Sequence, residues 1–362
     1  GWTDTHGTIH KYDDCIAGII VSRPIPELNP EVPQYVVRNT YGVIKTLADY
    51  AYKKRKGKMI AITGTAGKST TKNLFNTLLS NDYTTIATRG NHNTRTGVPL
   101  TIACSIIQPD FTIIETAISS LWMRSGGILK NYAPDVAMIT SIDGGQQKSA
   151  YETACLKSKI AEGMDNKGNV VLNRDMKEYE TVEKQVKQYN KNIFTYGFHN
   201  DADSRIIKVK ELRTTTIVKA EILGEIVKFE TQLNGKGMIQ NIVGTLTTLK
   251  LLGVKLNAVL KEIKKFSPSH SIQNFETYQT SKGHHFTLLN DSWNATGISM
   301  IEAIKLLAQK QKFYEGKTIV ILGRIVNLSK EEAKKQHENI ARTLIDSNVD
   351  IVFAHGPEMK YM

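Results

Sequence analysis

Residues 60–71 read Ile-Ala-Ile-Thr-Gly-Thr-Ala-Gly-Lys-Ser-Thr-Thr. An apolar, strand-like run passes into a glycine-containing loop, and Gly-Lys-Ser then opens a helix-type segment. In this arrangement backbone N–H groups and a helix N-terminus face an anion, Lys68 reaches the β- and γ-phosphates of a nucleotide, and Ser69 can ligate Mg²⁺. The strict Walker spacing requires glycine at position 62, where this chain has Ile62. The alternative is a chance Gly-Lys-Ser turn, which the flanking strand and helix patterns disfavour.

The chain around this loop alternates short apolar runs with helix-period segments, which is typical of an α/β fold with a parallel sheet. A Ser149-to-Glu152 capping box predicts a helix that runs to about Gly163. The strands predicted for this part of the chain lie at residues 59–63, 111–114, 136–140, 170–172 and 193–196.

Two later regions depart from this pattern. The polar alternation of residues 204–231 predicts a small antiparallel side sheet with strands at 205–210, 214–222 and 225–230. After a break at residues 266–269, a second α/β unit is expected. Its strands are predicted at 285–290, 318–322 and 351–354, and its helices at 299–310, with a capping box from Ser299 to Glu302, and at about 330–345.

Composition excludes several classes of protein. The 362 residues are 40% hydrophobic and carry a net charge of +12, which suggests an anionic partner. No run of about 18 apolar residues is present, so we expect no membrane span. Cys15, Cys104 and Cys155 contain no CxxC pair, which favours a reducing cytoplasm over a disulfide scaffold or a cysteine zinc site. We find no recognition helix, RNP aromatic motif or zinc finger, so no nucleic-acid partner is expected.

The compact Gly-Thr-x-Gly-Lys-Ser-Thr loop resembles that of the Mur ligase family, and further segments resemble motifs of its MurF branch. Their common order along the chain argues against chance similarity. These segments are Gly-Asn-His-Asn-Thr-Arg-Thr-Gly-Val-Pro at 90–99, Leu-Asn-Arg-Asp at 172–175, Asp-Ser-Trp-Asn-Ala at 291–295 and Ile-Val-Ile-Leu-Gly at 319–323.

The resemblance implies a three-part α/β organisation around a central P-loop ATPase domain with a small antiparallel side sheet. It places a partial N-terminal substrate-binding domain at residues 1–57 and the ATP-binding domain at 58–270. An incomplete Rossmann-like domain follows at 271–362. The chain starts at Gly1 without Met and stops just past an apolar run at 351–354, so we expect a fragment of a longer protein.

The activity implied is ATP-dependent amide bond formation through an acyl phosphate, with Mg²⁺ as cofactor and a carboxylate and an amine as substrates. The carboxylate substrate of such enzymes can be UDP-linked, and a monomer is expected. The resemblance gives catalytic roles to Lys68, Asn93 and Lys159. It implies nucleotide contacts from Gly64, Thr65, Ala66, Gly67, Lys68, Ser69, Thr70, Asn241, Asp291 and Asn294.

Four residues are predicted to hold Mg²⁺. Ser69 follows the phosphate-loop lysine, and Glu115 ends an apolar strand at the edge where a metal ligand belongs. Mur ligases carry a carbamylated lysine at the place of Lys159, with Lys157 as the alternative in register. Gln146 stands where the family has a metal-binding His, and it offers only an amide carbonyl oxygen. An exposed acid at 115 and exposed helix lysines remain the structural alternatives.

Other departures from the family pattern leave the reaction open. Gly237-Met238 replaces a His-Asn pair, and Gln273-Asn274 replaces a Gly-Arg pair. The first hypothesis is an active MurF-like ligase, with a non-standard substrate among the possibilities. The second is a cyanophycin or poly-γ-glutamate type of ligase. The third is a nucleotide-binding Mur-like pseudo-enzyme without turnover.

Overall fold

The main sheet has nine strands in the order β11-β10-β9-β8-β7-β6-β3-β5-β4. The computed structural model describes residues 6–9, 11, 15–122, 126–143, 148–267, 274–292, 295–325 and 328–362. The strands are β3 (Lys58–Thr63), β4 (Thr85–Ala87), β5 (Phe111–Glu115), β6 (Val136–Ile139), β7 (Asn169–Asn173), β8 (Asn192–Gly197), β9 (Ser204–Glu211), β10 (Thr216–Ile222) and β11 (Glu225–Thr231).

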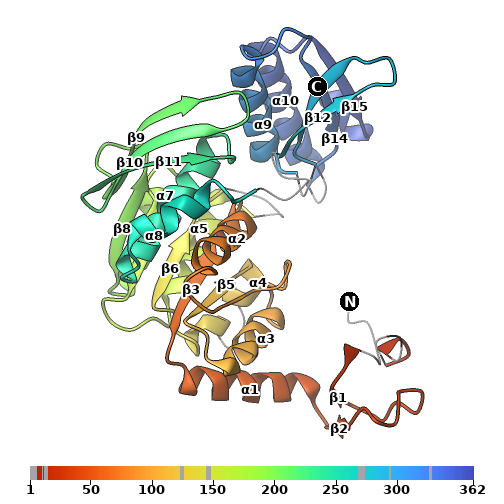
Figure 1. The fold of residues 1–362 in the computed structure, drawn as a ribbon, viewed down its shortest axis with the longest axis vertical. Coiled ribbons are helices and arrows are strands. Elements are labelled where there is room, and N and C mark those ends of the chain that lie inside the picture. Colours follow the sequence, from red (N-terminus) through yellow and green to blue (C-terminus); the bar gives the residue numbers. More distant parts are fainter. Residues whose placement is uncertain are drawn as a thin grey trace.

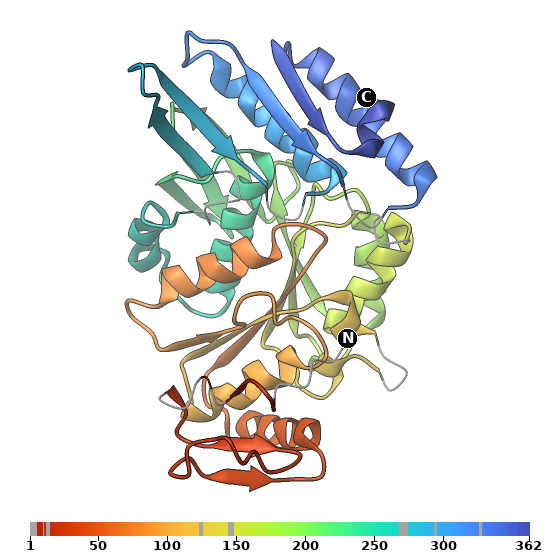
Figure 2. The same cartoon turned by 90° about the vertical axis from the view of Figure 1, so that its right-hand side faces the viewer.

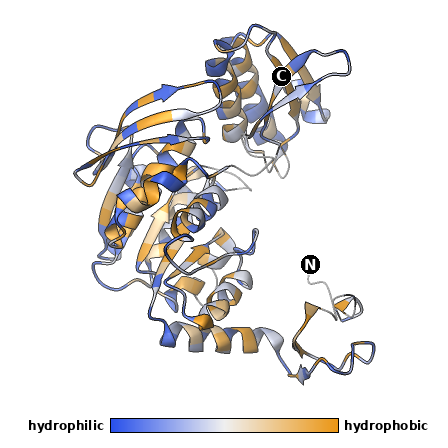
Figure 3. Ribbon diagram, in the orientation of Figure 1, coloured by the Kyte–Doolittle hydropathy of each residue, from blue (hydrophilic) through white to orange (hydrophobic). Residues whose placement is uncertain are grey.

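Strands β3 to β8 pair in parallel, and each of the five strands predicted from the sequence for this part of the sheet is present. Residues 59–63 of β3 are fully buried, because helices cover both faces of the sheet. Figure 3 shows these central strands coloured mainly as hydrophobic. The fold is therefore a mixed α/β fold with a mostly parallel sheet, as predicted.

Helices on the two faces of the sheet form two separate cores. One core contains buried residues of α2 (Lys68–Leu79), α7 (Lys236–Leu251) and α8 (Leu256–Ile263). The other contains residues of α1 (Thr40–Lys54), α3 (Gly97–Cys104), α4 (Ile118–Leu121), α5 (Ala150–Ser158) and α6 (Tyr179–Gln188). Short 3-10 turns follow at η2 (Ser105–Ile107), η3 (Ile128–Lys130), η4 (Lys159–Ala161) and η5 (Pro357–Tyr361). The Ser149–Glu152 capping box is present and opens α5 as predicted.

The three strands after residue 203 are antiparallel, as predicted, but they do not form a side sheet of their own. Strand β9 pairs in parallel with the end of β8, through Tyr196 opposite Ser204 and Gly197 opposite Arg205. Strands β10 and β11 then add in antiparallel order. The prediction of a separate side sheet was wrong, because β9 pairs with the edge of β8 that would otherwise be exposed and so continues the main sheet.

In the C-terminal unit, the described residues form two-stranded sheets packed with helices (Figure 2). β12 (Asn274–Gln279) and β13 (His285–Asn290) form an antiparallel hairpin, and β14 (Ile319–Gly323) and β15 (Ile351–His355) pair in parallel. Helices α9 (Gly297–Gln311) and α10 (Lys330–Asp346) share a core with them. The predicted cap at Ser299 was wrong, because Thr296 accepts a hydrogen bond from the Ser299 N–H and starts α9 two residues earlier.

The N-terminal residues form a small unit beyond α1, away from the main sheet (Figure 1). Strands β1 (Ile19–Val21) and β2 (Gln34–Val36) pair in parallel over a small core of Val21, Ile25, Leu28 and Val32. The boundaries 1–57, 58–270 and 271–362 remain predictions. None of the helices in the described part of the chain is both long and apolar enough to span a membrane.

Candidate functional site

The phosphate loop joins the buried end of β3 to the first turn of α2. Its backbone is fixed from the side by the segment after β6: the Thr65 N–H donates to the Ser141 carbonyl at 2.8 Å and the Thr140 hydroxyl donates to the Ala66 carbonyl at 2.6 Å. A Cβ on Gly64 would lie 1.9 Å from Thr140 Oγ1, so only glycine fits there. The loop is thus held in one conformation by its neighbours.

Lys68 folds back over this loop. Its Nζ donates to the carbonyls of Gly64 at 2.9 Å and Thr65 at 3.2 Å. Burial lowers the pKa of Lys68, and the nearby Glu115 carboxylate opposes that shift. An anion bound at the N-terminus of α2 would compete with these two carbonyls for the ammonium, which is the behaviour expected of a phosphate-binding lysine.

Glu115, Ser69 and Asn93 meet at the end of β5. Glu115 is 1% exposed, and its Oε1 accepts hydrogen bonds from Ser69 Oγ at 3.0 Å and Asn93 Nδ2 at 2.7 Å. Its Oε2 is buried without a hydrogen-bond partner. The sequence placed these three residues in one site, and the structure brings them together.

The Oε2 atom, which no donor hydrogen-bonds, gives a test of whether these residues fit Mg²⁺. A buried carboxylate oxygen without a donor, beside a serine hydroxyl, matches the oxygen ligands that Mg²⁺ takes from proteins. No group of three His, Cys, Asp or Glu side chains gathers as a metal site within the described residues.

Of the two candidate lysines, Lys157 is the more deeply buried, and the charges of Lys68 and Glu115 act on it. Lys157 is 4% exposed, whereas Lys159 is half-buried in the 3-10 turn after α5. Burial lowers the pKa of Lys157 well below its usual value, Lys68 acts in the same direction, and Glu115 opposes it. The helix register therefore brings the alternative lysine, two residues earlier, into the field of Lys68 and Glu115.

The sequence analysis did not single out Lys72, which also reaches the cluster. Its Nζ lies 3.6 Å from Glu115 Oε2 and donates to the Gly90 carbonyl at 2.6 Å. The signal that could have found it is helical spacing, because positions four apart share a face and Lys72 follows Lys68 by four. Gln240 was missed as well, and it hydrogen-bonds Asp175.

The remaining predicted nucleotide contacts are placed as follows. A Cβ on Gly67 would lie 2.4 Å from Asn241 Nδ2, so Asn241 of α7 lies directly against the phosphate loop. Thr70 is buried in the first turn of α2. Asp291 follows β13 and is half-buried. Gln146 and Asn294 lie outside the described residues.

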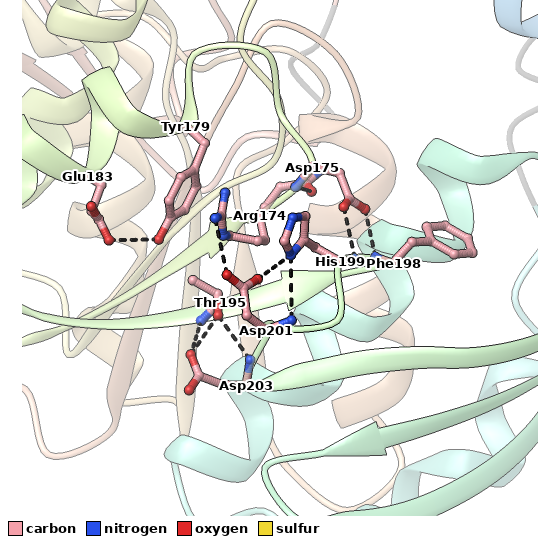
Figure 4. Close-up of polar contacts among 10 residues, drawn as sticks. Arg174, Asp175, Tyr179, Glu183, Thr195, Phe198, His199, Asp201 and Asp203 are labelled. Atoms are coloured by element: carbon pink, nitrogen blue, oxygen red, sulfur yellow. Dashed lines mark hydrogen bonds and ion pairs between the residues drawn. The ribbon is translucent and has the colours of Figure 1, made fainter.

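The Leu-Asn-Arg-Asp segment braces α7 against the sheet. Asn173 Nδ2 donates to the Thr140 carbonyl at 3.0 Å. Asp175 accepts from the backbone N–H groups of Phe198 at 2.6 Å and His199 at 3.0 Å (Figure 4). It also accepts from Gln240 Nε2 at 2.5 Å. Since Gln240 precedes Asn241, these bonds fix the start of the helix that contacts the phosphate loop.

Beside this brace, Arg174 lies over the ring of Tyr179 at 4.2 Å and donates to Asp201 at 3.2 Å (Figure 4). Arg174, Tyr179, His199 and Lys236 are among the residues around an open hollow of about 570 Å³. The hollow is solvent-exposed and carries charges of both signs, and it adjoins the brace rather than the Glu115 cluster.

Residues 62–249, more than half of the chain, match the model of the Mur ligase middle domain. The chain belongs to the Mur ligase family. This is a family of ATP-dependent peptide ligases, and the matched region contains the phosphate loop, Asn93, Glu115, Lys157 and Asn241.

Individual relatives agree with the family match. The UDP-N-acetylmuramoyl-tripeptide--D-alanyl-D-alanine ligase of Rickettsia prowazekii is 24% identical over 367 residues, which cover 100% of this Mur ligase chain and 79% of the relative. MurF from Acinetobacter baumannii superposes with a TM-score of 0.79 at 22% identity, covering 99% of this chain and 76% of that one. MurF ligase from Thermotoga maritima in complex with ADP gives a TM-score of 0.77 at 20% identity, covering 97% and 80%. At such identities the solved structures establish the fold alone.

Proposed function

We propose that this chain is an ATP-dependent, ADP-forming amide ligase of the MurF type. The observation that carries the proposal is the Glu115 cluster: a buried carboxylate beside the phosphate loop, with one oxygen bonded to Ser69 and Asn93 and the other without a hydrogen-bond donor. In the reaction a substrate carboxylate attacks the γ-phosphorus of ATP, and ADP leaves. An amine then attacks the acyl carbon, phosphate leaves, and the amine proton passes to solvent or a base.

Residues of this chain would divide the work as follows. The loop N–H groups of residues 64–69 and Lys68 would hold the phosphates. The rest of the nucleotide would contact Asn241, Thr70 and Asp291. Ser69 and Glu115 would hold Mg²⁺, which neutralises developing phosphate charge when bound. Asn93 would keep the Glu115 carboxylate in its orientation.

We assign the carbamylated lysine of the family to Lys157 in place of Lys159. CO₂ reacts with a neutral amine, giving a carbamate and a proton, and burial favours the neutral form of Lys157. A carbamate at Lys157 would turn a cation into a carboxylate-like anion beside Lys68. Lys159 is only half-buried, in the 3-10 turn after α5.

The substrates proposed are a carboxylic acid that can be UDP-linked and an amino acid or peptide amine. The Rickettsia relative is described as a ligase of UDP-N-acetylmuramoyl-tripeptide and D-alanyl-D-alanine, so this pair is the first candidate. A role in cell-wall peptidoglycan synthesis, a cytoplasmic location and a monomeric state belong to the same proposal. Neither a nucleic acid nor a membrane is part of it.

The test is ATP-dependent phosphate release with the first candidate pair and then with panels of other acids and amines. Release that requires both an acid and an amine supports the ligase. Release with glutamate chains or aspartate–arginine polymers as the acid would favour the poly-γ-glutamate or cyanophycin type. ATP binding without release for any pair would overturn the ligase proposal and favour the pseudo-enzyme. Glu115→Gln, which leaves Lys68 and the loop intact, is expected to bind ATP but to lower turnover by about 100-fold or more.

A further inference from the structure

Lys72 is a buried lysine whose position the proposed reaction does not explain. It lies in α2, four residues after Lys68 and three after Ser69, and its side chain is 4% exposed. Burying a lysine costs side-chain entropy and desolvation, so its ammonium needs strong partners. Both partners of Lys72 are parts of the candidate site.

The first partner is the loop that carries Asn93. Lys72 Nζ donates to the Gly90 carbonyl at 2.6 Å, a short charge-assisted hydrogen bond. Three residues later, Asn93 donates through Nδ2 to Glu115 and accepts through its carbonyl from the Ala117 N–H at 2.8 Å. The loop is therefore attached to α2 at Gly90 and to the end of β5 at Asn93.

The second partner is Glu115 itself. Lys72 Nζ lies 3.6 Å from Oε2, which is close enough for strong attraction but too long for a hydrogen bond. The ammonium thus opposes the cost of burying the carboxylate charge and aims Oε2 toward α2, while leaving its lone pairs without a donor. Oε1 is already occupied by Ser69 and Asn93.

We propose that Lys72 is a positioning residue of the metal site: it joins α2, the Gly90–Asn93 loop and Glu115 so that Oε2 is held ready for Mg²⁺. The proposal rests on the proposed function, because it assumes that Glu115 is a ligand of the nucleotide-bound metal. The two partners of Lys72 Nζ, the Gly90 carbonyl and the Glu115 carboxylate, both lie outside the phosphate loop. Removing it should therefore weaken metal binding while leaving metal-free nucleotide binding unchanged.

The test measures binding of Mn²⁺, as a spectroscopic stand-in for Mg²⁺, to the full chain saturated with ATP. Lys72→Met is expected to weaken Mn²⁺ binding by about 10- to 100-fold, the usual cost of losing a group that orients a metal ligand. ATP affinity measured in EDTA should change by less than about 3-fold, since the loop groups remain. Lys72→Arg, which can reach both partners, should restore Mn²⁺ affinity to within about 3-fold of wild type.

Lys250 provides a matched control. Its Nζ also donates to a backbone carbonyl, that of Ile222 at 3.0 Å, and pairs with a glutamate, Glu225, at 2.9 Å. It lies at the C-terminal end of α7, away from the cluster. Lys250→Met should leave Mn²⁺ binding unchanged. If it weakens binding as much as Lys72→Met, the effect is general destabilisation and the proposal fails.

Two further variants keep the outcomes distinct. If circular dichroism shows that Lys72→Met is unfolded, Lys72→Gln replaces it, and wild-type Mn²⁺ affinity in that variant would overturn the proposal. Glu115→Gln tests the assumption that Glu115 is a ligand of the metal. Should Glu115→Gln bind Mn²⁺ like wild type, the metal site of the proposed function is wrong. Should Glu115→Gln lose Mn²⁺ while Lys72→Met keeps it, only the role of Lys72 is wrong.

Discussion

Lys157 is one of three lysines that the buried Glu115 carboxylate attracts, the others being Lys68 and Lys72. Burial lowers the pKa of both Lys68 and Lys157. Phosphate bound at the site, or a carbamate on Lys157, would stabilise the lysines that stay charged. The lowered pKa of Lys157 also makes the stability of the free protein depend on pH.

The sign of that dependence follows from the direction of the Lys157 shift. Below its native pKa, Lys157 is charged in both the folded and the unfolded chain, and the burial penalty acts in full. Between the native pKa and the ordinary value of 10.5, the folded chain releases the proton first, so the penalty declines as pH rises. Lys157→Met should therefore raise the free energy of unfolding at pH 7, and its advantage should shrink as pH approaches 10.5.

Urea unfolding of both proteins in CO₂-depleted buffer, from about pH 7 to about pH 10, measures this difference. Removal of CO₂ keeps Lys157 as a free amine. An advantage of Lys157→Met that stays constant over the whole range, or that grows with pH, would contradict the assigned direction of the shift.

Asp175 is a second residue whose effect can be isolated. Replacing it by Ala leaves the Phe198 and His199 N–H groups without their acceptor and removes the shorter of two hydrogen bonds from the Gln240 amide. We expect a loss of about 2–4 kcal/mol in the free energy of unfolding, because unsatisfied donors keep their desolvation cost. Asp201→Ala, in the loop between β8 and β9, removes an exposed ion pair with Arg174 and should cost at most about 1 kcal/mol. If chemical denaturation shows that Asp175→Ala and Asp201→Ala lower the free energy of unfolding equally, Asp175 does not brace α7 as described.

The sequence could predict those site residues whose position is marked by a pattern in the adjacent residues. Ser69 and Glu115 follow a loop and a buried strand whose patterns are local, and the ends of parallel strands meet at one edge. Choosing between Lys157 and Lys159 required the exact rotation of α5, because two helical residues differ by about 200° around the axis. Lys72 was missed for a different reason: its spacing from Lys68 places it on the same face of the helix, but does not show that Gly90 and Glu115 lie opposite it.

At the scale of elements, a row of lysines crosses the antiparallel end of the sheet. Lys219 of β10 lies opposite Lys208 of β9 on one side and Lys228 of β11 on the other, and all three are exposed. Like charges directly opposite each other destabilise a strand pair. These lysines account for part of the +12 net charge that the site does not use.

Lys219→Glu would convert two repulsive cross-strand pairs into attractive ones. We expect it to raise the free energy of unfolding by about 0.5–1 kcal/mol at low salt, with the gain reduced at high salt by screening. Thermal or urea unfolding at two salt concentrations measures it. Lys210→Glu is the control, because Lys210 lies opposite Ile217 and gains no such pair. A gain of the same size in the control would show that only net charge matters.

The burial of individual strands explains why some strands were predicted from the sequence and others were missed. Strands β3 and β5 to β7 are buried on both faces and read as continuous apolar runs. Strands β2 and β4 have three residues each, and neither has a fully buried residue. Their pairing is set by neighbours distant in sequence rather than by their own composition, so no local pattern could reveal them.

At the scale of the whole molecule, the tip of the β9–β10 hairpin touches the end of α9 (Figure 1). Lys310 is 1% exposed, and its Nζ donates to the Leu212 carbonyl at 2.7 Å with the rings of Phe275 and Phe313 about it. Arg213 lies over the Tyr314 ring at 4.9 Å. This contact joins the far end of the main sheet to the C-terminal unit, apart from the chain connection near residues 266–274.

Because Asp291 belongs to the C-terminal unit and the phosphate loop to the main sheet, a nucleotide that touches both requires the two parts to keep a defined orientation. Lys310→Ala removes the buried ammonium and should weaken their contact by about 1–3 kcal/mol, the range for a lost hydrogen bond to a charged group. Lys312→Ala, an exposed neighbour beside Phe313, leaves the Leu212 bond intact and is the control. The expected result for Lys310→Ala is a larger radius of gyration in small-angle X-ray scattering and a separate, earlier unfolding step of the C-terminal unit. If Lys310→Ala matches Lys312→Ala in both measurements, the hairpin contact does not hold the C-terminal unit in place, and its orientation must depend on the connection or on bound nucleotide.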